Sequence, residues 1–84
     1  MNERIRDILR RYARLAVDVA SIGDDTDLYQ SGMASHATVS VMLALESEFG
    51  VEFPDRMLKR SVFESIASIK TALSELEDAV RLAG

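Results

Sequence analysis

The chain has 84 residues, a formal net charge of −4 and no cysteine. This length predicts one small domain, over residues 1–84, whose core is too small to enclose a large active site. The lack of cysteine excludes disulfides and thiolate metal sites and fits a reducing compartment. No apolar run approaches the ~20 residues of a membrane span, and the charged N-terminus lacks the apolar block of a secretion signal. We therefore expect a cytoplasmic protein with no membrane span.

An apolar stripe at three-and-four spacing near the N-terminus predicts a first helix that ends before Gly23. The stripe consists of Ile5, Ile8, Leu9, Tyr12, Ala16 and Val19. Residues 24–33 have no sustained period and are rich in Asp, Thr, Ser and Gly, which predicts a long loop. We expect Leu28, Tyr29 and Met33 to anchor this loop to the core. Loops of this length in compact domains usually carry function.

A second helix is predicted from Ser35, as its N-cap, to about Phe49, because Ser is a favoured N-cap and Gly50 stops the helix. Its expected apolar side consists of Val39, Met42, Leu43, Leu45 and Phe49, with Glu46 on the polar side. Met42, like Met57 further on, is either an ordinary core residue or part of an adaptable wall around an apolar ligand.

Pro54 fits the first turn of a short third helix that runs to about Leu58. Ser61 and Glu64 have the spacing of a capping box ahead of the last helix. The apolar stripe of that helix consists of Val62, Ile66, Ile69, Leu73, Leu76 and Val80. The sequence thus predicts an all-α four-helix bundle with a long first loop and a short third helix.

The charges are divided unevenly along the chain. Residues 24–55 contain seven acidic residues and no Lys or Arg, whereas the flanking segments are slightly basic. An acidic face in this central segment would attract basic partner surfaces and repel nucleic acids. The alternative is an acidic surface that serves solubility alone.

The string Gly32-Met33-Ala34-Ser35 places a hydroxyl where the loop meets the second helix. Unpaired N–H groups and the positive end of the helix dipole stabilise an anion at such a position. Ser35 is therefore a candidate for covalent modification, although a plain N-cap is the alternative. We expect a positive φ at Gly32 that lets Ser35 project outward. Ser31 is the nearest competitor, but it lies within the loop.

Other chemistries are weakly supported. His36 is the only histidine, so neither a catalytic triad nor a zinc site is favoured; it is either exposed or bonded to a phosphate on Ser35. The loop fails the calcium-binding EF-hand pattern, which needs Gly and Glu where this chain has Gln30 and His36. Glu46 and Glu48 lie two apart on a helix and do not face each other, so we expect surface or partner contacts.

Together with the segments on both sides of it, the Ser35 site resembles that of the acyl carrier protein family. The matching segments are Asp27-Leu28-Tyr29, the run from Val39 to Phe49, and Glu52-Phe53-Pro54-Asp55. The resemblance implies that a phosphopantetheinyl transferase moves 4′-phosphopantetheine from coenzyme A to Ser35, within a site that includes Gly32, Met33, Ala34 and His36. It also implies a non-enzymatic carrier of acyl thioesters for a specialised fatty acid, lipid or polyketide pathway.

The chain departs from the family pattern around the serine and in the third helix. Ala34 and His36 stand where the family usually has Asp and Leu, and Arg56, Lys59 and Arg60 form a basic patch where familiar carriers are acidic. Such changes favour other acyl-transferring or condensing partners than those of the standard synthases. Glu46, Glu48 and the basic patch are the expected partner contacts of a monomer.

Two alternatives to the acyl carrier remain open. One is a peptidyl or aminoacyl carrier, which uses the same arm on the same fold. The other is a small helical interaction module that is not modified.

Overall fold

The computed structural model describes residues 1–83, with side chains described as far as residue 79. Its elements are α1 (Asn2–Tyr12), the 3₁₀ turn η1 (Val19–Ser21), α2 (Ser35–Phe49), the 3₁₀ turn η2 (Asp55–Met57), α3 (Arg60–Phe63) and α4 (Ile66–Ala83). Residues 1–83 contain no strand. The predicted all-α fold with four helices, the third of them short, is confirmed.

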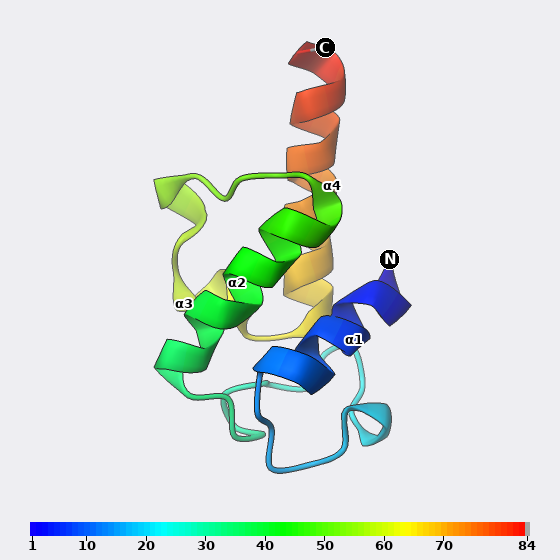
Figure 1. The fold of residues 1–84 in the computed structure, drawn as a ribbon, viewed down its shortest axis with the longest axis vertical. Coiled ribbons are helices and arrows are strands. Elements are labelled where there is room, and N and C mark those ends of the chain that lie inside the picture. Colours follow the sequence, from blue (N-terminus) through cyan, green and yellow to red (C-terminus); the bar gives the residue numbers. More distant parts are fainter. Residues whose placement is uncertain (84) are drawn as a thin grey trace.

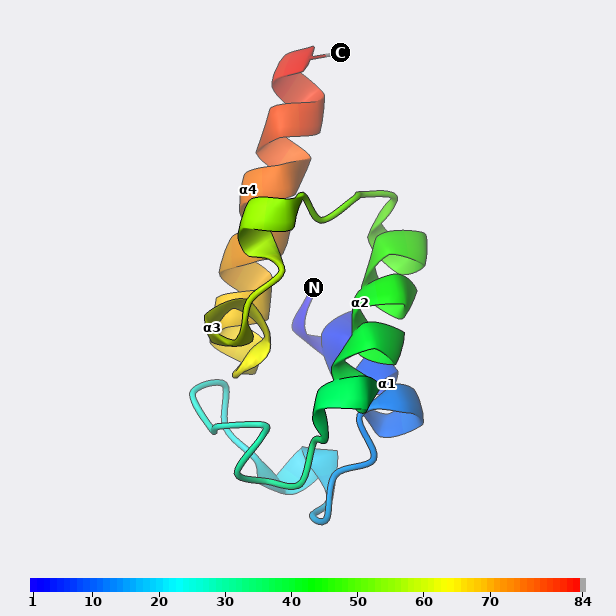
Figure 2. The same ribbon diagram turned by 90° about the vertical axis from the view of Figure 1, so that its left-hand side faces the viewer.

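The helices are arranged as packed neighbours with loops at both ends (Figures 1 and 2). α1 packs against both α2 and α4, and α3 packs against α4. The C-terminal part of α4 extends beyond the other helices, while the long loop between α1 and α2 closes the opposite end (Figure 1). None of the helices described here has the length and hydropathy that crossing a membrane requires.

The first helix ends at Tyr12, about three turns earlier than the apolar stripe predicted. Arg14 adopts the left-handed backbone conformation, with φ of 54°, which interrupts the helix without a glycine or proline. Tyr12 and Ala16 are consequently exposed, and Ala13 takes a buried place instead. Val19 still reaches the core, but from a 3₁₀ turn.

The chain after α1 is held by contacts that the sequence pattern did not indicate. The Asp18 side chain accepts a hydrogen bond from the Ala20 N–H at 2.9 Å and caps η1. Arg6 Nη1 donates to the Val19 carbonyl at 2.7 Å, which ties η1 back to α1. These bonds compensate for the helical ones that a continued α1 would have made.

The second helix has the predicted bounds, but its N-cap and its buried face differ from the prediction. Gly50 ends it in the left-handed conformation, with φ of 64°, as expected. Ala34 is the N-cap and makes no side-chain cap, so Ser35 is the first helical residue rather than the N-cap.

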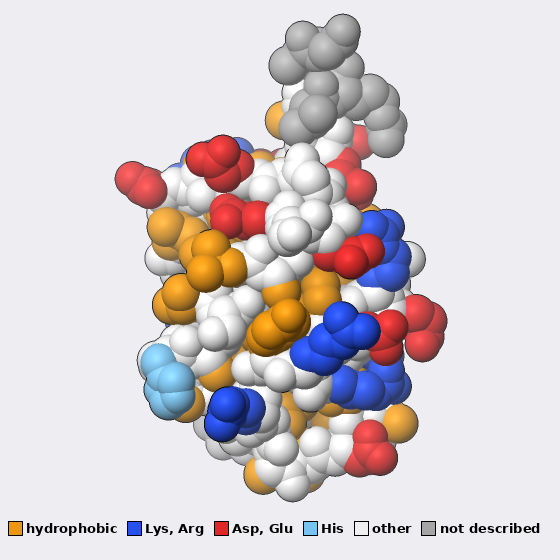
Figure 3. Space-filling view, in the orientation of Figure 1, with side chains coloured by type: hydrophobic (Ala, Val, Ile, Leu, Met, Phe, Trp, Pro, Cys, Tyr) orange, Lys and Arg blue, Asp and Glu red, His pale blue; other side chains and the backbone are white. Residues whose placement is uncertain are grey.

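The buried side of α2 also differs from the predicted apolar side. It consists of Ala37, Val41 and Leu45, whereas Val39 and Leu43 are 53% and 55% exposed. Hydrophobic side chains accordingly gather on the surface beside α2, above the chain's only histidine (Figure 3). A helix that is apolar on more than one side has more than one partner surface.

The segment between α2 and α4 contains the 3₁₀ turn η2 and the one-turn helix α3 instead of one helix from Pro54 to Leu58. Pro54 is extended and acts as the N-cap of η2, and α3 follows only at Arg60. Ser61 lies inside α3, so the predicted capping box with Glu64 is wrong. The cap of α4 is formed by Ser65 and Ser68, each of whose backbone N–H groups donates to the other's hydroxyl at 3.1 Å.

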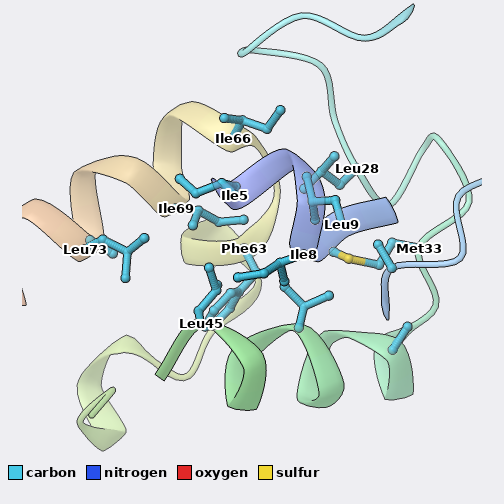
Figure 4. Packing of buried hydrophobic residues seen from close by; sticks show 14 of the residues in the cluster. Ile5, Ile8, Leu9, Leu28, Met33, Leu45, Phe63, Ile66, Ile69 and Leu73 are labelled. Carbon is cyan, nitrogen blue, oxygen red and sulfur yellow. The ribbon is translucent and has the colours of Figure 1, made fainter. Parts of the chain in front are cut away.

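The core is built from aliphatic side chains of α1, α2 and α4 together with residues of the long loop (Figure 4). The predicted stripe of α4 is confirmed for Ile66, Ile69, Leu73 and Leu76, all of which are buried. Val62 packs against this core from α3, and the Val80 side chain lies outside the described ones. The largest fully buried side chains are Ile5, Leu9, Leu28, Leu45, Ile66, Ile69 and Leu73.

Asp24 connects the long loop to α1. Its carboxylate accepts hydrogen bonds from Asn2 Nδ2 at 3.1 and 3.2 Å and from Arg6 Nη2 at 3.1 Å. The hydrogen bond from Asn2 is the main reason that the pKa of Asp24 is lowered from its ordinary 3.8, and Arg6 and Lys70 add to this effect against a partial desolvation.

We expect the Leu45→Ala variant to lower the free energy of unfolding by about 2–5 kcal/mol, because it leaves a cavity in a fully buried part of α2. Urea denaturation followed by circular dichroism measures this change. The matched control is Leu43→Ala, the same substitution at an exposed position of the same helix, which should change the free energy by less than about 0.5 kcal/mol. Equal costs for the two variants would contradict the buried side assigned to α2.

We expect Asp24→Asn to destabilise the protein at neutral pH and to lose this effect in acid. A carboxylate with a lowered folded pKa contributes its stabilisation above the unfolded value, here near 3.8, and loses it as the pH falls through the folded value. The difference in unfolding free energy between wild type and variant should therefore shrink below that pH. The exposed neighbour Asp25, changed to Asn, is the control, and a pH-independent difference for Asp24→Asn would argue against the ion pair.

Candidate functional site

Ser35 stands at the start of α2 with its side chain exposed. Its hydroxyl has no hydrogen-bond partner among the described residues, whereas the competing hydroxyl of Ser31 donates to the Asp27 carbonyl at 3.0 Å. Of the two serines, only Ser35 therefore presents a free nucleophilic oxygen. Because Ala34 provides no side-chain cap, the first N–H groups of α2 also remain open to an anion.

The loop that precedes Ser35 is ordered by local turns and by anchors in the core. The Asp27 carboxylate accepts from the backbone N–H groups of Tyr29 at 2.9 Å and Gln30 at 3.1 Å, which makes an Asx turn. Leu28 and Met33 are buried and Tyr29 is partly buried, so the three predicted anchors are confirmed. Ser35 is thus held by a loop that is fixed on both sides.

Gly32 brings the loop against the chain that leaves α1. Its φ is 114°, which confirms the positive φ predicted from the sequence. A Cβ at this position would lie 2.8 Å from the Ala16 nitrogen, the same N–H that donates to the Ser31 carbonyl at 2.9 Å. Only glycine fits this close approach, and the turn directs the chain into α2.

Ser35 lies at the edge of an open groove of about 270 Å³ between α2 and the η2–α3 segment. The α2 wall consists of Ser35, Thr38, Val39 and Met42, and the facing wall of Leu58, Lys59, Arg60 and Phe63, with Tyr29 between them. The two walls belong to different packed pairs, since α2 packs on α1 and α3 on α4. The groove is lined partly by core side chains, since Phe63 is buried and Tyr29 and Met42 pack against the core, and partly by the exposed Val39 and Leu58.

Tyr29 connects the two walls of the groove. Its hydroxyl is hydrogen-bonded to Thr38 Oγ1 at 3.1 Å, and the Arg60 guanidinium carbon lies 4.2 Å from the centre of its ring. Thr38 is three residues after Ser35, so both side chains lie on the same face of α2. Arg60 is thereby held beside the first turn of α2.

The charge around Ser35 differs from the expected acidic face. The charged residues that line the groove are Lys59 and Arg60, both basic. Four of the seven central acids serve the chain's own contacts: Asp24 binds Asn2 and Arg6, Asp27 caps its turn, Glu46 accepts from the Phe53 N–H, and Glu48 binds Arg4. The groove at Ser35 is therefore lined by basic rather than acidic side chains.

The structure separates the other residues predicted for the site. His36 is exposed at the start of α2 but does not line the groove, and Met33 lies in the core, 3% exposed. Glu46 and Glu48 are near the other end of α2, with their carboxylates in the intramolecular bonds described above. Arg56 is paired with Glu75 Oε1 at 3.2 Å and does not line the Ser35 groove, although it borders a second hollow that Lys59 also lines.

Sequence reasoning missed most of the groove. The sequence pattern predicts Tyr29 as a loop anchor and Val39 on the apolar side of the second helix. It indicates no role for Thr38. Met42 was considered as a wall residue and does line the groove, while Met57 is buried in the core. The sequence did contain a signal for the groove. Between Val39 and Leu45, apolar residues occupy almost every side of the helix, and a single core cannot cover all of these sides.

Comparisons with known proteins agree with this geometry. The family model described as "Phosphopantetheine attachment site" matches residues 3–76. The chain is 41% identical to an aminoacyl carrier protein from Agrobacterium fabrum over 78 residues, which are 93% of this chain and 94% of the relative. It is 30% identical to the mitochondrial acyl carrier protein of Saccharomyces cerevisiae over 79% of this chain and 57% of that one.

A solved structure is similar over nearly its whole length. It is a chain in the crystal structure of an engineered Bradyrhizobium japonicum glycine:[carrier protein] ligase complexed with a carrier protein from Agrobacterium tumefaciens and AMP. The TM-score is 0.86 and the identity 42%, over 88% of this chain and 99% of that one.

We expect Gly32→Ala to lower the free energy of unfolding by at least about 1 kcal/mol, because the new Cβ combines a left-handed backbone with a close contact to the Ala16 nitrogen. Urea denaturation measures the loss. Gly23→Ala is the matched control in the same loop, since its Cβ would lie 3.7 Å from Thr26 Oγ1, an ordinary contact. A Gly32→Ala variant as stable as Gly23→Ala would show that the loop relaxes without strain.

Proposed function

The chain belongs to the family of phosphopantetheine attachment domains, and from this premise we propose that it is an aminoacyl carrier protein whose arm is esterified to Ser35. The family's prosthetic group is a covalently attached 4′-phosphopantetheine. The observation that carries the proposal is the free Ser35 hydroxyl at the start of α2, at the edge of a groove.

The residues around Ser35 fit this group. A phosphodiester on the serine oxygen would meet the uncapped start of α2 and the positive charges of Lys59 and Arg60. The apolar side chains of Val39, Met42 and Phe63 offer a surface to the less polar part of the arm. The arm supplies a terminal thiol, which a chain without cysteine does not possess, for a thioester link to the cargo.

Attachment requires a phosphopantetheinyl transferase as the first partner. In this step the Ser35 oxygen forms a bond to the phosphorus that bears the pantetheine, and the pyrophosphate bond of coenzyme A breaks, releasing adenosine 3′,5′-bisphosphate. The transferase accepts the serine proton. This chain contributes the positioned hydroxyl and the surface that the transferase recognises, and the catalytic groups belong to the enzyme.

The cargo is proposed on the strength of the relatives. Identity is 41% over 93% of the chain to an aminoacyl carrier protein, against 30% over 79% to a mitochondrial acyl carrier protein. The relatives therefore support the aminoacyl alternative more than the fatty acid, lipid or polyketide pathway first expected. The second proposed partner is accordingly a ligase that activates an amino acid and transfers it to the arm, as the name of the similar complex indicates for its own carrier.

From these proposed partners we infer that the chain acts in the cytoplasm, where coenzyme A and a ligase of this kind would be present. The chain itself then acts without catalysis, by displaying the cargo and by being recognised.

We expect incubation with coenzyme A and a broad-specificity transferase to add the mass of one phosphopantetheine, and Ser35→Ala to abolish the gain while its helical circular dichroism persists. Ser40→Ala, at an exposed position on the same helix, is the matched control and should be modified like the wild type. A wild-type chain that stays unmodified would leave only the helical interaction module.

The cargo is tested on the modified chain with the Bradyrhizobium glycine:[carrier protein] ligase, glycine and ATP. We expect a second mass increase, by one glycyl residue, which hydroxylamine removes as it does other thioesters. An acyl carrier protein synthetase with a fatty acid serves as the opposing assay. Loading by that enzyme alone would overturn the aminoacyl assignment and restore the acyl one.

A further inference from the structure

We propose that Arg60 and Lys59 bind the phosphodiester of the arm on Ser35 and hold the arm's proximal end over the groove, with Tyr29 as the residue that positions Arg60. This inference rests on the proposed attachment at Ser35. It assigns a ligand to two basic side chains that the sequence suggested only as partner contacts. The ligand chemistry is a single phosphodiester anion.

The first argument is placement. Ser35, Lys59 and Arg60 border the same open groove, and the described residues that line it include no acid. A phosphodiester on the Ser35 oxygen would therefore face two cations and no competing carboxylate. Charge-assisted bonds from Arg or Lys to a phosphate are among the stronger hydrogen bonds in proteins.

The second argument is the pairing of the cations. Neither Lys59 nor Arg60 forms an ion pair with any residue that the structure describes, although both are exposed and close in sequence to Glu64. By contrast, Arg56 on η2 is paired with Glu75 at 3.2 Å, and Arg4 with Glu48 at 2.8 Å. The two groove cations are thus available to an anion from outside the folded chain.

The third argument is the preorganisation of Arg60. Its guanidinium stacks on the ring of Tyr29 at 4.2 Å, and the Tyr29 hydroxyl is bonded to Thr38 in the first turn of α2. Stacking on an aromatic face leaves the N–H groups at the edge of the guanidinium free for a planar, two-pronged contact with phosphate. Because Thr38 follows Ser35 by one turn, Arg60 is fixed relative to the serine.

The start of α2 adds to this arrangement. Ala34 supplies no cap, and the first turn of the helix contains no acidic residue. A phosphodiester on Ser35 would provide the negative charge that this helix start lacks. Loading the arm should consequently stabilise the folded chain.

The test compares the unmodified and modified chain in the wild type and three variants after mass spectrometry has verified complete modification. At low ionic strength, we expect modification to raise the Tm of the wild type by about 4 °C, as one net charge-assisted contact would in a domain of this size. The rise should fall by at least half in Arg60→Gln and in Lys59→Gln and should weaken as salt is added. Arg56→Gln, whose arginine is paired with Glu75, is the matched control and should keep the full rise.

Two further readouts separate binding from a general effect on folding. We expect the NMR signal of the Arg60 Nε–Hε group to shift between the unmodified and the modified wild type. We also expect the phosphorus signal of the modified wild type to differ from that of modified Arg60→Gln. Tyr29→Leu should reduce the rise in Tm more than Tyr29→Phe, which keeps the ring under Arg60 and loses only the bond to Thr38.

The outcomes distinguish this inference from the proposed function. The phosphodiester site is overturned, and attachment at Ser35 left intact, if modification occurs but these substitutions change neither the rise in Tm nor the NMR signals of Arg60 and the phosphorus. Failure of the wild type to gain the mass of the arm overturns both. A rise in Tm that persists equally in Arg60→Gln and Lys59→Gln assigns the stabilisation to the helix start alone and also overturns the site.

Discussion

The position of Ser35 depends above all on how Leu28 fastens the long loop to the bundle. Its side chain is fully buried, and its backbone N–H donates to the Glu64 carbonyl, at the junction of α3 and α4, over 2.7 Å. Its own carbonyl accepts from Ser31 and from Met33, which closes the turn that leads to α2. One residue therefore joins the C-terminal pair of helices to the segment that presents the serine.

A few contacts with α1 and with the segment that follows it hold the other side of the loop. The Ala16 N–H donates to the Ser31 carbonyl, and the glycine at position 32 allows the two segments to approach this closely. Asp24 adds a polar connection to Asn2 and Arg6 of α1. The long loop is thus held at several points, and the proposed attachment at Ser35 would need such support if partner enzymes are to find the serine in a constant place.

The sequence predicted those parts of the fold whose signals are local. The bounds of α2, the buried stripe of α4 and the three loop anchors follow from helical spacing and from Gly50 as a stop, and the structure confirms them. The end of α1 escaped prediction because a left-handed Arg14 carries no compositional signal. The third helix was misplaced because Pro54 fits an N-cap as well as a first turn, and only the tertiary packing selects between them.

The sequence singles out Ser35 as the proposed attachment residue, but it does not indicate which residues surround it. Ser35 follows from its place between loop and helix, but the groove is formed by residues from Tyr29 to Phe63 that only the fold brings together. The net charge of the central segment was a poor guide as well, because only the fold shows which charged side chains are paired. A carboxylate that pairs with an arginine contributes less to the field outside the protein than an unpaired charge does. With Glu48 bound to Arg4 and Asp24 to Arg6, the charge that a partner meets beside Ser35 is that of Lys59 and Arg60. An acidic chain accordingly presents a groove with basic and apolar walls beside Ser35.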